Sequence, residues 1–245
     1  MEFFLVFLAA VAPALVLLIY IYRCDRARPE PWRWLLKGFL FGVCSTGVSL
    51  LMSTPLEAMG CFTTEPSTFS ESVRCAFLGA AIPEETAKLI MLWLLLRRNP
   101  YFDERIDGIV YAATIGLGFA AAENVMYLFG NYESWLSVGI TRAIFSVPGH
   151  FFFAVAMGYF YALAYFTKSS VMVKACVWLV PVLLHGTFDA ILFVSQVTPG
   201  SQAVLLLLFL FFCHFLRKKA SKRIESHLQA DANNRYWDIF NNRFK

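Results

Sequence analysis

Charged residues are scarce in this chain of 245 residues, where only 16% are Asp, Glu, Lys or Arg and 58% are hydrophobic. This balance argues against a disordered chain and against a water-soluble enzyme. Cysteine is scarce too: the six residues form no C-x-x-C pair, so neither a zinc ribbon nor a thioredoxin-like motif is supported. Cys61 and Cys75 both lie toward the predicted outer side, and the sequence leaves open whether they form a disulfide. The composition that remains is that of a membrane protein.

Seven apolar windows are close to the length of about 20 residues that a helix needs to cross a bilayer. They predict an all-α polytopic membrane helix bundle with about seven transmembrane helices. We expect one transmembrane domain over residues 1–216 and a basic cytoplasmic tail over residues 217–245. No basic leader precedes the first window, so we expect a retained anchor rather than a cleaved signal peptide. The windows are 3–22, 36–53, 73–96, 107–129, 139–166, 175–196 and 202–216.

The positions of the basic residues predict the orientation of the bundle. Most of the 21 Lys and Arg residues lie in the first, third and fifth connections and in the tail, and such residues concentrate on the cytoplasmic side. We therefore expect the N-terminus outside and the C-terminus in the cytoplasm of a multi-pass protein of the cell membrane. Because the basic residues alternate with apolar runs, the net charge of +4 indicates contact with the lipid bilayer and no nucleic-acid partner.

Small residues mark the surfaces where two of the predicted helices pack. Gly38 and Gly42 form a G-x-x-x-G pair in the second window, and Gly116 and Gly118 lie just before three Ala residues in the fourth. Such residues let helix backbones approach closely. The sequence shows no internal repeat and no inverted symmetry, which argues against a transporter built from repeats.

Three ionisable residues lie well inside the third window: Glu84, Glu85 and Lys88. A charge at the centre of a membrane helix costs about 2.5–3.5 kcal/mol, so these side chains must face protein or trapped water. Lys88 is four residues from Glu84 and three from Glu85, within reach of both. A self-neutralising ion pair would explain Lys88 and one Glu but not the second carboxylate. Pro83 removes a backbone hydrogen bond and is expected to open the helix here.

Three further windows carry polar residues at a similar depth. Counting inward from the predicted helix ends at ~1.5 Å per residue places them in the middle and outer half of the bilayer. We therefore expect them to share one pocket with the three residues of the third window. Arg74 and Arg142 lie near outer helix ends and are expected to snorkel to the membrane surface. The polar residues are Glu123 and Asn124 in the fourth window, His150 in the fifth, and His185 and Asp189 in the sixth.

The expected pocket carries more acidic than basic side chains. Glu84, Glu85, Glu123 and Asp189 outnumber Lys88, and a low-dielectric interior does not tolerate unpaired charge. Either some carboxyl groups keep their protons, which would make one of them a general base, or a divalent metal binds among Glu and His ligands. Both routes lead to activation of water for hydrolysis. The candidate metal ligands are Glu84, Glu123, His150 and His185.

Four short motifs follow one another in consecutive windows. They are E-E-x-x-K at 84–88, F-x-x-x-E at 119–123, His150, and H-x-x-x-D at 185–189. The series resembles that of the PrsW intramembrane proteases, which are relatives of the CAAX-processing and bacteriocin-processing membrane endopeptidases. The resemblance covers about residues 75–195 and places the catalytic core at about residues 73–196.

The resemblance implies a membrane endopeptidase with a membrane-anchored protein substrate. In the best-known case that substrate is an anti-sigma factor, cut outside the cytoplasm at the start of a stress-signalling cascade. By the same resemblance Glu84 activates the attacking water, Glu85 is its partner and His150 positions the water. His185 and Asp189 would stabilise the developing oxyanion.

The remaining polar residues have less defined roles in this comparison. Glu123 stands where CAAX-type relatives carry a His in their F-x-x-x-H motif, which leaves open whether Glu123 or His150 assumes that role. Lys88 would tune the Glu pair, and Asn124 would support the site.

Two questions stay open at the level of sequence. The family is often described as a metalloprotease, but CAAX-type relatives have also been interpreted as glutamate-dependent enzymes. This chain lacks H-E-x-x-H, so the cofactor is either a divalent metal such as zinc or none. The alternative function is a proton- or ion-coupled transporter, because rows of intramembrane Glu, Asp and His also form proton relays.

Overall fold

The computed structural model describes the backbone of residues 2–243 and the side chains of residues 2–235. Within these residues the chain is helical and contains no strand, which confirms the all-α fold. The elements are α1 (Glu2–Cys24), α2 (Trp32–Ala58), α3 (Phe69–Arg74), η1 (Cys75–Ala81), α4 (Ile82–Leu96), α5 (Arg105–Gly130), η2 (Tyr132–Ser134), α6 (Trp135–Thr141), η3 (Arg142–Ser146), α7 (Val147–Phe166), α8 (Val171–Val197) and α9 (Gln202–Arg243).

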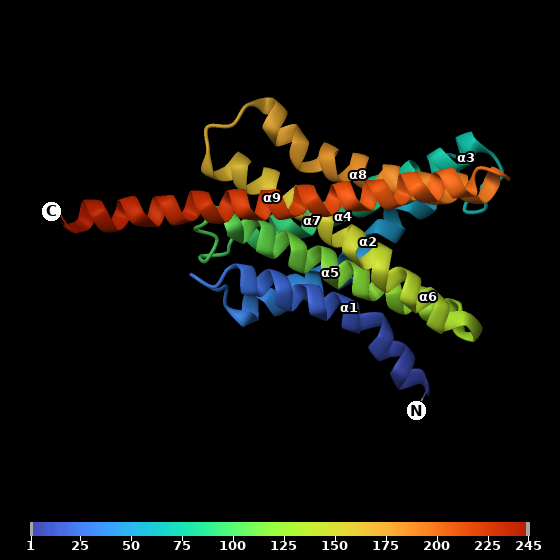
Figure 1. Ribbon diagram of the computed structural model, residues 1–245, viewed down its shortest axis with the longest axis horizontal. Helices are drawn as coiled ribbons and strands as arrows, with labels where there is room; N and C mark the ends of the chain where they lie inside the picture. The colour runs from blue at the N-terminus through green and yellow to red at the C-terminus, as the bar shows by residue number, and fades with distance from the viewer. Residues whose placement is uncertain (1, 244–245) are drawn as a thin grey trace.

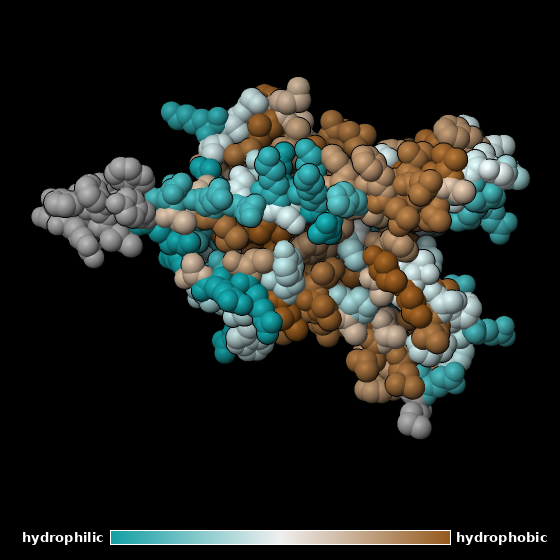
Figure 2. All heavy atoms as spheres, in the orientation of Figure 1, coloured by the Kyte–Doolittle hydropathy of each residue, from teal (hydrophilic) through white to brown (hydrophobic). Residues whose placement is uncertain are grey.

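Five helical segments are long and apolar enough to cross a membrane: α1, α2, α5, the run Tyr132–Phe166 and α8. The other two predicted windows are helical as well, one as α3, η1 and α4 in succession and one as the start of α9. On the visible face the hydrophobic side chains are most continuous in the right-hand half, and hydrophilic ones gather at the right-hand tip and over the left part, where they reach the middle along α9 (Figure 2). The described chain starts and ends at opposite ends of the molecule (Figure 1), as an odd number of crossings requires.

Helix α5 is the centre of the bundle, and 78% of its membrane-spanning window is buried. It packs against α1, α2 and α7. At the crossing with α2, Gly42 faces the backbone of Ile115 and Gly118 faces the backbone of Phe39, so closely that a Cβ on either glycine would overlap a carbonyl oxygen. This confirms the predicted packing surface of small residues.

The crossing of α5 with α7 also has glycines where the two backbones come closest. Gly158 faces the backbone of Gly108, and Gly116 faces the methyl group of Ala154 and the carbonyl oxygen of His150. Because Gly116 has no side chain, the backbone of α7 at His150 can lie against α5, about two turns from Glu123. Glycine on α5 therefore determines how closely the polar residues of two helices approach.

A π-helical turn lies just before the proline near the start of α4 and just before the proline near the start of α7. Element η1 precedes Pro83 and η3 precedes Pro148, and each π-turn ends in a hydrogen bond that spans five residues, from Ile82 to Phe77 and from Val147 to Arg142. Proline cannot donate to the carbonyl four residues earlier, and its ring crowds that carbonyl, so the helix widens instead. The predicted opening at Pro83 is thus a wide turn within a continuous helix.

Residues after 216 continue α9 without interruption and dock on the first turn of α5. Asp231 accepts hydrogen bonds from the backbone N–H groups of Arg105 (3.0 Å) and Ile106 (2.8 Å), as an N-terminal cap would. Arg235 pairs with Glu104 at 2.9 Å. The proposed boundary between domain and tail at residue 216 therefore falls inside a helix, and residues after this boundary, up to Arg235, contact the bundle. Cys61 and Cys75 are free thiols in this fold.

The crossing of α2 and α5 leads to a stability prediction. Replacing Gly42 by Ala places a methyl group against the backbone of α5, and we expect a loss of roughly 1–3 kcal/mol of stability from overpacking. The matched control is Gly47→Ala on the same helix, where an added Cβ meets no atom within 4 Å. Thermal unfolding of the two purified variants in detergent measures the difference. Equal melting temperatures would contradict the close crossing.

Candidate active site

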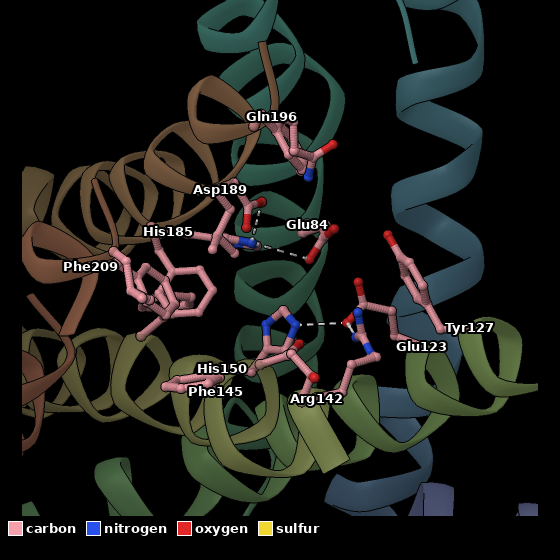
Figure 3. Close-up of a pocket in the computed structure, with 18 residues that line it drawn as sticks. Glu84, Glu123, Tyr127, Arg142, Phe145, His150, His185, Asp189, Gln196 and Phe209 are labelled. Carbon is pink, nitrogen blue, oxygen red and sulfur yellow. Dashed lines mark hydrogen bonds and ion pairs between the residues drawn. The ribbon is translucent and has the colours of Figure 1, made fainter. Parts of the chain in front are cut away.

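A cavity of about 450 Å³ lies among α4, α5, α7, α8 and the start of α9. Figure 3 shows that the side chains of Glu84, Glu123, His150, His185 and Asp189 point into one common space, with Phe145 and Phe209 beside it. The cavity wall combines the predicted polar site residues with Phe and Leu residues. The lining residues include Tyr127, Arg142, Ser146, Phe153, Phe188, Leu192, Phe193, Gln196 and Leu206.

The first turn of α4 divides its two carboxylates between cavity and core. Glu84 lines the cavity and keeps 13% of its side chain exposed, whereas Glu85 is fully buried. Lys88 reaches both, with its Nζ 3.3 Å from Glu84 Oε2 and 2.8 Å from Glu85 Oε1. The pair therefore has two different surroundings: one carboxylate faces the space where water and substrate fit, and the other serves as a buried acceptor.

His185 of α8 lies between three carboxylates. Its Nδ1 is 2.9 Å from Glu85 Oε1, and its Nε2 lies 3.2 Å from Asp189 Oδ2 and 3.9 Å from Glu84 Oε2. With Nδ1–H donating to Glu85, Nε2 faces two more acceptors. Only a proton or a bound cation at Nε2 makes that arrangement attractive. The ring of Phe153 stacks on the imidazole at 4.8 Å between centroids and restricts its rotation.

His150 of α7 joins the α4 group to Glu123 of α5. Its Nδ1 is 3.1 Å from Lys88 Nζ, which can only donate, so Nδ1 is the acceptor. Its Nε2 then carries the proton and donates to Glu123 Oε2 at 2.8 Å. The imidazole is thereby held as the neutral Nε2–H tautomer. Its ring centroid lies 5.2 Å from that of His185, so the two histidines face the same cavity.

Arg142 also lines this cavity, which corrects the expectation that it snorkels to the membrane surface. Its guanidinium contacts Glu123 Oε2 and donates from Nε to Asn124 Oδ1 at 2.6 Å. The side chain is 13% exposed and lies over the ring of Tyr127 at 3.9 Å from its centroid. Residues 142, 146 and 150 are four apart, so the spacing to His150 was a signal that Arg142 shares its face.

Asn124 is not part of the cavity wall, although it was predicted beside Glu123. Its amide is buried, donates to the backbone oxygen of Ala10 at 3.1 Å and accepts from Arg142. It therefore ties α1 to the arginine rather than facing a substrate. Tyr127 and Phe153 line the cavity and were not singled out from the sequence, because aromatic residues are common on every helix of this chain.

The donor set fits a divalent metal at one corner of the cavity. Glu84, His150 and His185 each offer a ligand atom, and the three atoms lie within 4.8 Å of one another. Two imidazole nitrogens and one carboxylate oxygen are donors that catalytic zinc uses. The hydrogen bond from His185 Nδ1 to Glu85 is also the kind that orients metal-binding histidines. Glu123, the fourth candidate ligand, instead contacts His150 and Arg142.

The ionisable side chains in and behind the cavity wall carry an excess of negative charge. Four carboxylates, on Glu84, Glu85, Glu123 and Asp189, face two fixed cations, on Lys88 and Arg142. A proton on His185 or a divalent cation would reduce this excess. The arrangement thus provides an acceptor for a proton of water, donors for a developing oxyanion and a confined space for a peptide, which are the elements of hydrolysis.

A polytopic helix bundle with such a cavity defines a class of membrane-embedded hydrolases, and the comparisons with known proteins agree. Residues 30–215 match the PrsW family of intramembrane metalloproteases. The chain is 34% identical over 193 residues to Protease PrsW of Clostridioides difficile, covering 77% of this chain and 79% of that protein. It is 33% identical over 194 residues to Protease PrsW of Bacillus subtilis, covering 77% and 83%. No solved structure is significantly similar.

The chain therefore belongs to the PrsW family of intramembrane proteases, and it is a multi-pass membrane endopeptidase. This confirms the resemblance drawn from the four motifs. A third relative, Protease PrsW of Geobacillus kaustophilus, is 34% identical over 189 residues, covering 77% of this chain and 80% of the relative. The comparisons give no support to an ion-coupled transporter.

The buried contacts of Lys88 lead to a second stability prediction. In Lys88→Met the carboxylates of Glu84 and Glu85 lose their cation, and breaking a buried ion pair on one side costs about 3–5 kcal/mol. We expect a clear fall in melting temperature and partial recovery in the double variant Lys88→Met, Glu85→Gln. Lys37→Met is the control, because Lys37 is exposed and forms no ion pair among the described side chains. A melting temperature of Lys88→Met equal to that of the control would refute the role of the cation.

Proposed function

We propose that this protease hydrolyses a peptide bond of a membrane-anchored protein in the cavity, with Glu84 as the base that activates water. One observation carries the proposal: of the two carboxylates on α4, only Glu84 lines the cavity, and it lies 3.9 Å from His185 Nε2. A base must reach water, and its partner must reach the same reacting atoms. Glu85 meets neither condition directly.

The residues that line the cavity account for each proton transfer of the proposed reaction. Glu84 takes a proton from water as the water oxygen bonds to the peptide carbonyl carbon. The carbonyl oxygen becomes an oxyanion, which a proton on His185 Nε2, favoured by Asp189, stabilises as a hydrogen-bond donor. The C–N bond then breaks, and the proton held by Glu84 passes to the leaving amine. Each step uses a group whose position is determined by its own hydrogen bonds.

Three buried residues act through those that touch the substrate. Glu85 accepts from His185 Nδ1 and orients the ring, and Lys88 keeps Glu85 ionised by contact at 2.8 Å. His150, held by Lys88 and Glu123, presents its ring to the water site beside Glu84. These are positioning roles for Glu85 and Lys88, and a water-positioning role for His150.

A metal held by Glu84, His150 and His185 would replace one hydrogen bond of His150, whose Nδ1 now faces Lys88 and whose Nε2 faces Glu123. When bound, a divalent metal acidifies water and polarises the peptide carbonyl. The buried contacts of Glu85 and Lys88 would serve the same orienting purpose in either case.

The shape of the cavity supports a hydrophobic protein segment as substrate. Phe188, Leu192, Leu206 and Phe209 line the cavity together with the polar groups. This wall suits the membrane-proximal part of a single-span protein. By the family resemblance, an anti-sigma factor cleaved on its extracytoplasmic side is the substrate class we propose.

Loss of the proposed base should abolish cleavage. We expect Glu84→Gln and His185→Ala to lower cleavage of a co-expressed single-span substrate by at least about 10²-fold, because proton transfer of this kind contributes 10²–10⁴-fold. Membrane insertion should be unchanged. The matched control is Glu57→Gln, which alters an exposed carboxylate near the end of α2. Immunoblotting of substrate and product measures cleavage, and full activity of Glu84→Gln would remove the proposal.

Chelation tests whether cleavage requires a metal, independently of the substitutions. The reaction proposed above places a proton on His185 Nε2 and uses no metal, so we expect cleavage by the purified protease in detergent to survive 1,10-phenanthroline. Loss of cleavage that added Zn²⁺ restores would instead assign Glu84, His150 and His185 as ligands of a metal.

A further inference from the structure

Three buried carboxylates from separate parts of the chain meet at the end of the bundle that the charge distribution assigns to the cytoplasm. Asp25 follows α1, Glu30 precedes α2, and Asp107 lies in the first turn of α5. One oxygen from each lies within 4.8 Å of the other two. Along α5, Asp107 and Glu123 are about 24 Å apart at 1.5 Å per residue, so this cluster is separate from the active site.

Asp25 has no partner among the described residues. It is only 1% exposed, and both of its carboxylate oxygens are buried without a hydrogen bond. Leaving a buried carboxylate unpaired is costly, because its hydration is lost and nothing replaces it. The side chain is nonetheless placed where its oxygen meets those of Glu30 and Asp107. Such a group indicates a ligand that lies between the three carboxylates.

The N–H groups at the start of α5 are already used by other acceptors. Asp107 Oδ2 accepts from the backbone of Asp103 at 3.0 Å and of Glu104 at 2.6 Å. Asp231 takes the N–H groups of the next two residues. The helix N-terminus, which commonly compensates a buried carboxylate, therefore has no free donor for Asp25.

Two nearby arginines pair with carboxylates outside the cluster. Arg28 contacts Asp103 at 3.2 Å and Glu104 at 3.3 Å, and Arg235 contacts Glu104 at 2.9 Å. Neither forms an ion pair with a member of the cluster among the described side chains. Glu30 accepts a hydrogen bond from the hydroxyl of Tyr111, which is neutral.

We propose that Asp25, Glu30 and Asp107 bind a divalent cation that prefers oxygen ligands: Mg²⁺, Mn²⁺ or Ca²⁺. The three side chains offer only oxygen atoms, with no imidazole or thiolate at the cluster, and this donor set selects hard cations over zinc. The cation would join the connection between α1 and α2 to the first turn of α5, on which α9 also docks. Its role is structural and does not depend on the proposed hydrolysis.

Manganese provides a direct test, because free and bound Mn²⁺ are distinguished by electron paramagnetic resonance. The purified full chain in detergent, stripped with EDTA, should bind one Mn²⁺ per chain that Asp25→Asn and Glu30→Gln do not bind. The variant with Glu84→Gln and His185→Ala, which removes two candidate ligands of the active site, should keep this ion. Asp103→Asn is the matched control, since its carboxylate is 54% exposed and lies outside the cluster.

Stability gives a second measurement on the same samples. At about 100 times its Kd, Mn²⁺ should raise the melting temperature of the parent chain by roughly 5–10 °C and leave that of Asp25→Asn unchanged. Excess Mg²⁺ or Ca²⁺ should displace the bound Mn²⁺. Three results would each overturn the proposal. The first is Mn²⁺ binding by Asp25→Asn and Glu30→Gln equal to that of the parent, and the second is absence of bound Mn²⁺ in the Glu84→Gln, His185→Ala variant. The third is retention of Mn²⁺ in the presence of excess Mg²⁺ and of excess Ca²⁺. If Asp25→Asn does not fold, Glu30→Gln decides the same question.

Discussion

The ammonium group of Lys88 is buried within the bundle and lies within 3.3 Å of Glu84, Glu85 and His150. It also lies over the ring of Phe119, 3.9 Å from its centroid. This one cation therefore contacts groups from α4, α5 and α7, and through Glu85 it determines the orientation of His185 on α8. In a low-dielectric interior each of these groups needs an opposite charge or a hydrogen bond, so the relative positions of four helices are coupled to one side chain.

Close helix crossings make this network possible. Glycines at the crossings of α5 with α2 and α7 remove the side chains that would otherwise keep the backbones apart. On α8, Gly186 faces the ring of Phe77 in η1, which brings the neighbouring His185 within hydrogen-bond distance of α4. The π-turns before Pro83 and Pro148 shift the register of α4 and α7 immediately before Glu84 and His150. Packing and helix irregularity together position the polar residues.

Much of this site follows from local rules. A charge in an apolar helix must be buried against protein, and Glu84, Lys88, His150 and His185 are therefore recognisable as members of a polar interior. The helical spacing of Glu84 and Lys88 also predicts their contact. Arg142 was misplaced because its position near a helix end is equally compatible with snorkelling, and only the neighbouring Glu123 and Asn124 make the inward rotamer favourable. The different surroundings of Glu84 and Glu85 depend on which side of α4 the other helices cover.

The amino-acid sequence by itself determined the all-α membrane fold, the windows of its helices and the ionisable residues within them. The free energy of placing an apolar or charged side chain in a membrane helix depends mainly on that residue, so it can be assessed along the sequence. Tertiary structure decided which carboxylate faces the cavity, which histidine nitrogen carries a proton, and that Asp25, Glu30 and Asp107 lie within 4.8 Å of one another. Those outcomes depend on contacts between residues far apart in the chain. Helical periodicity holds no information about such contacts until the helices pack.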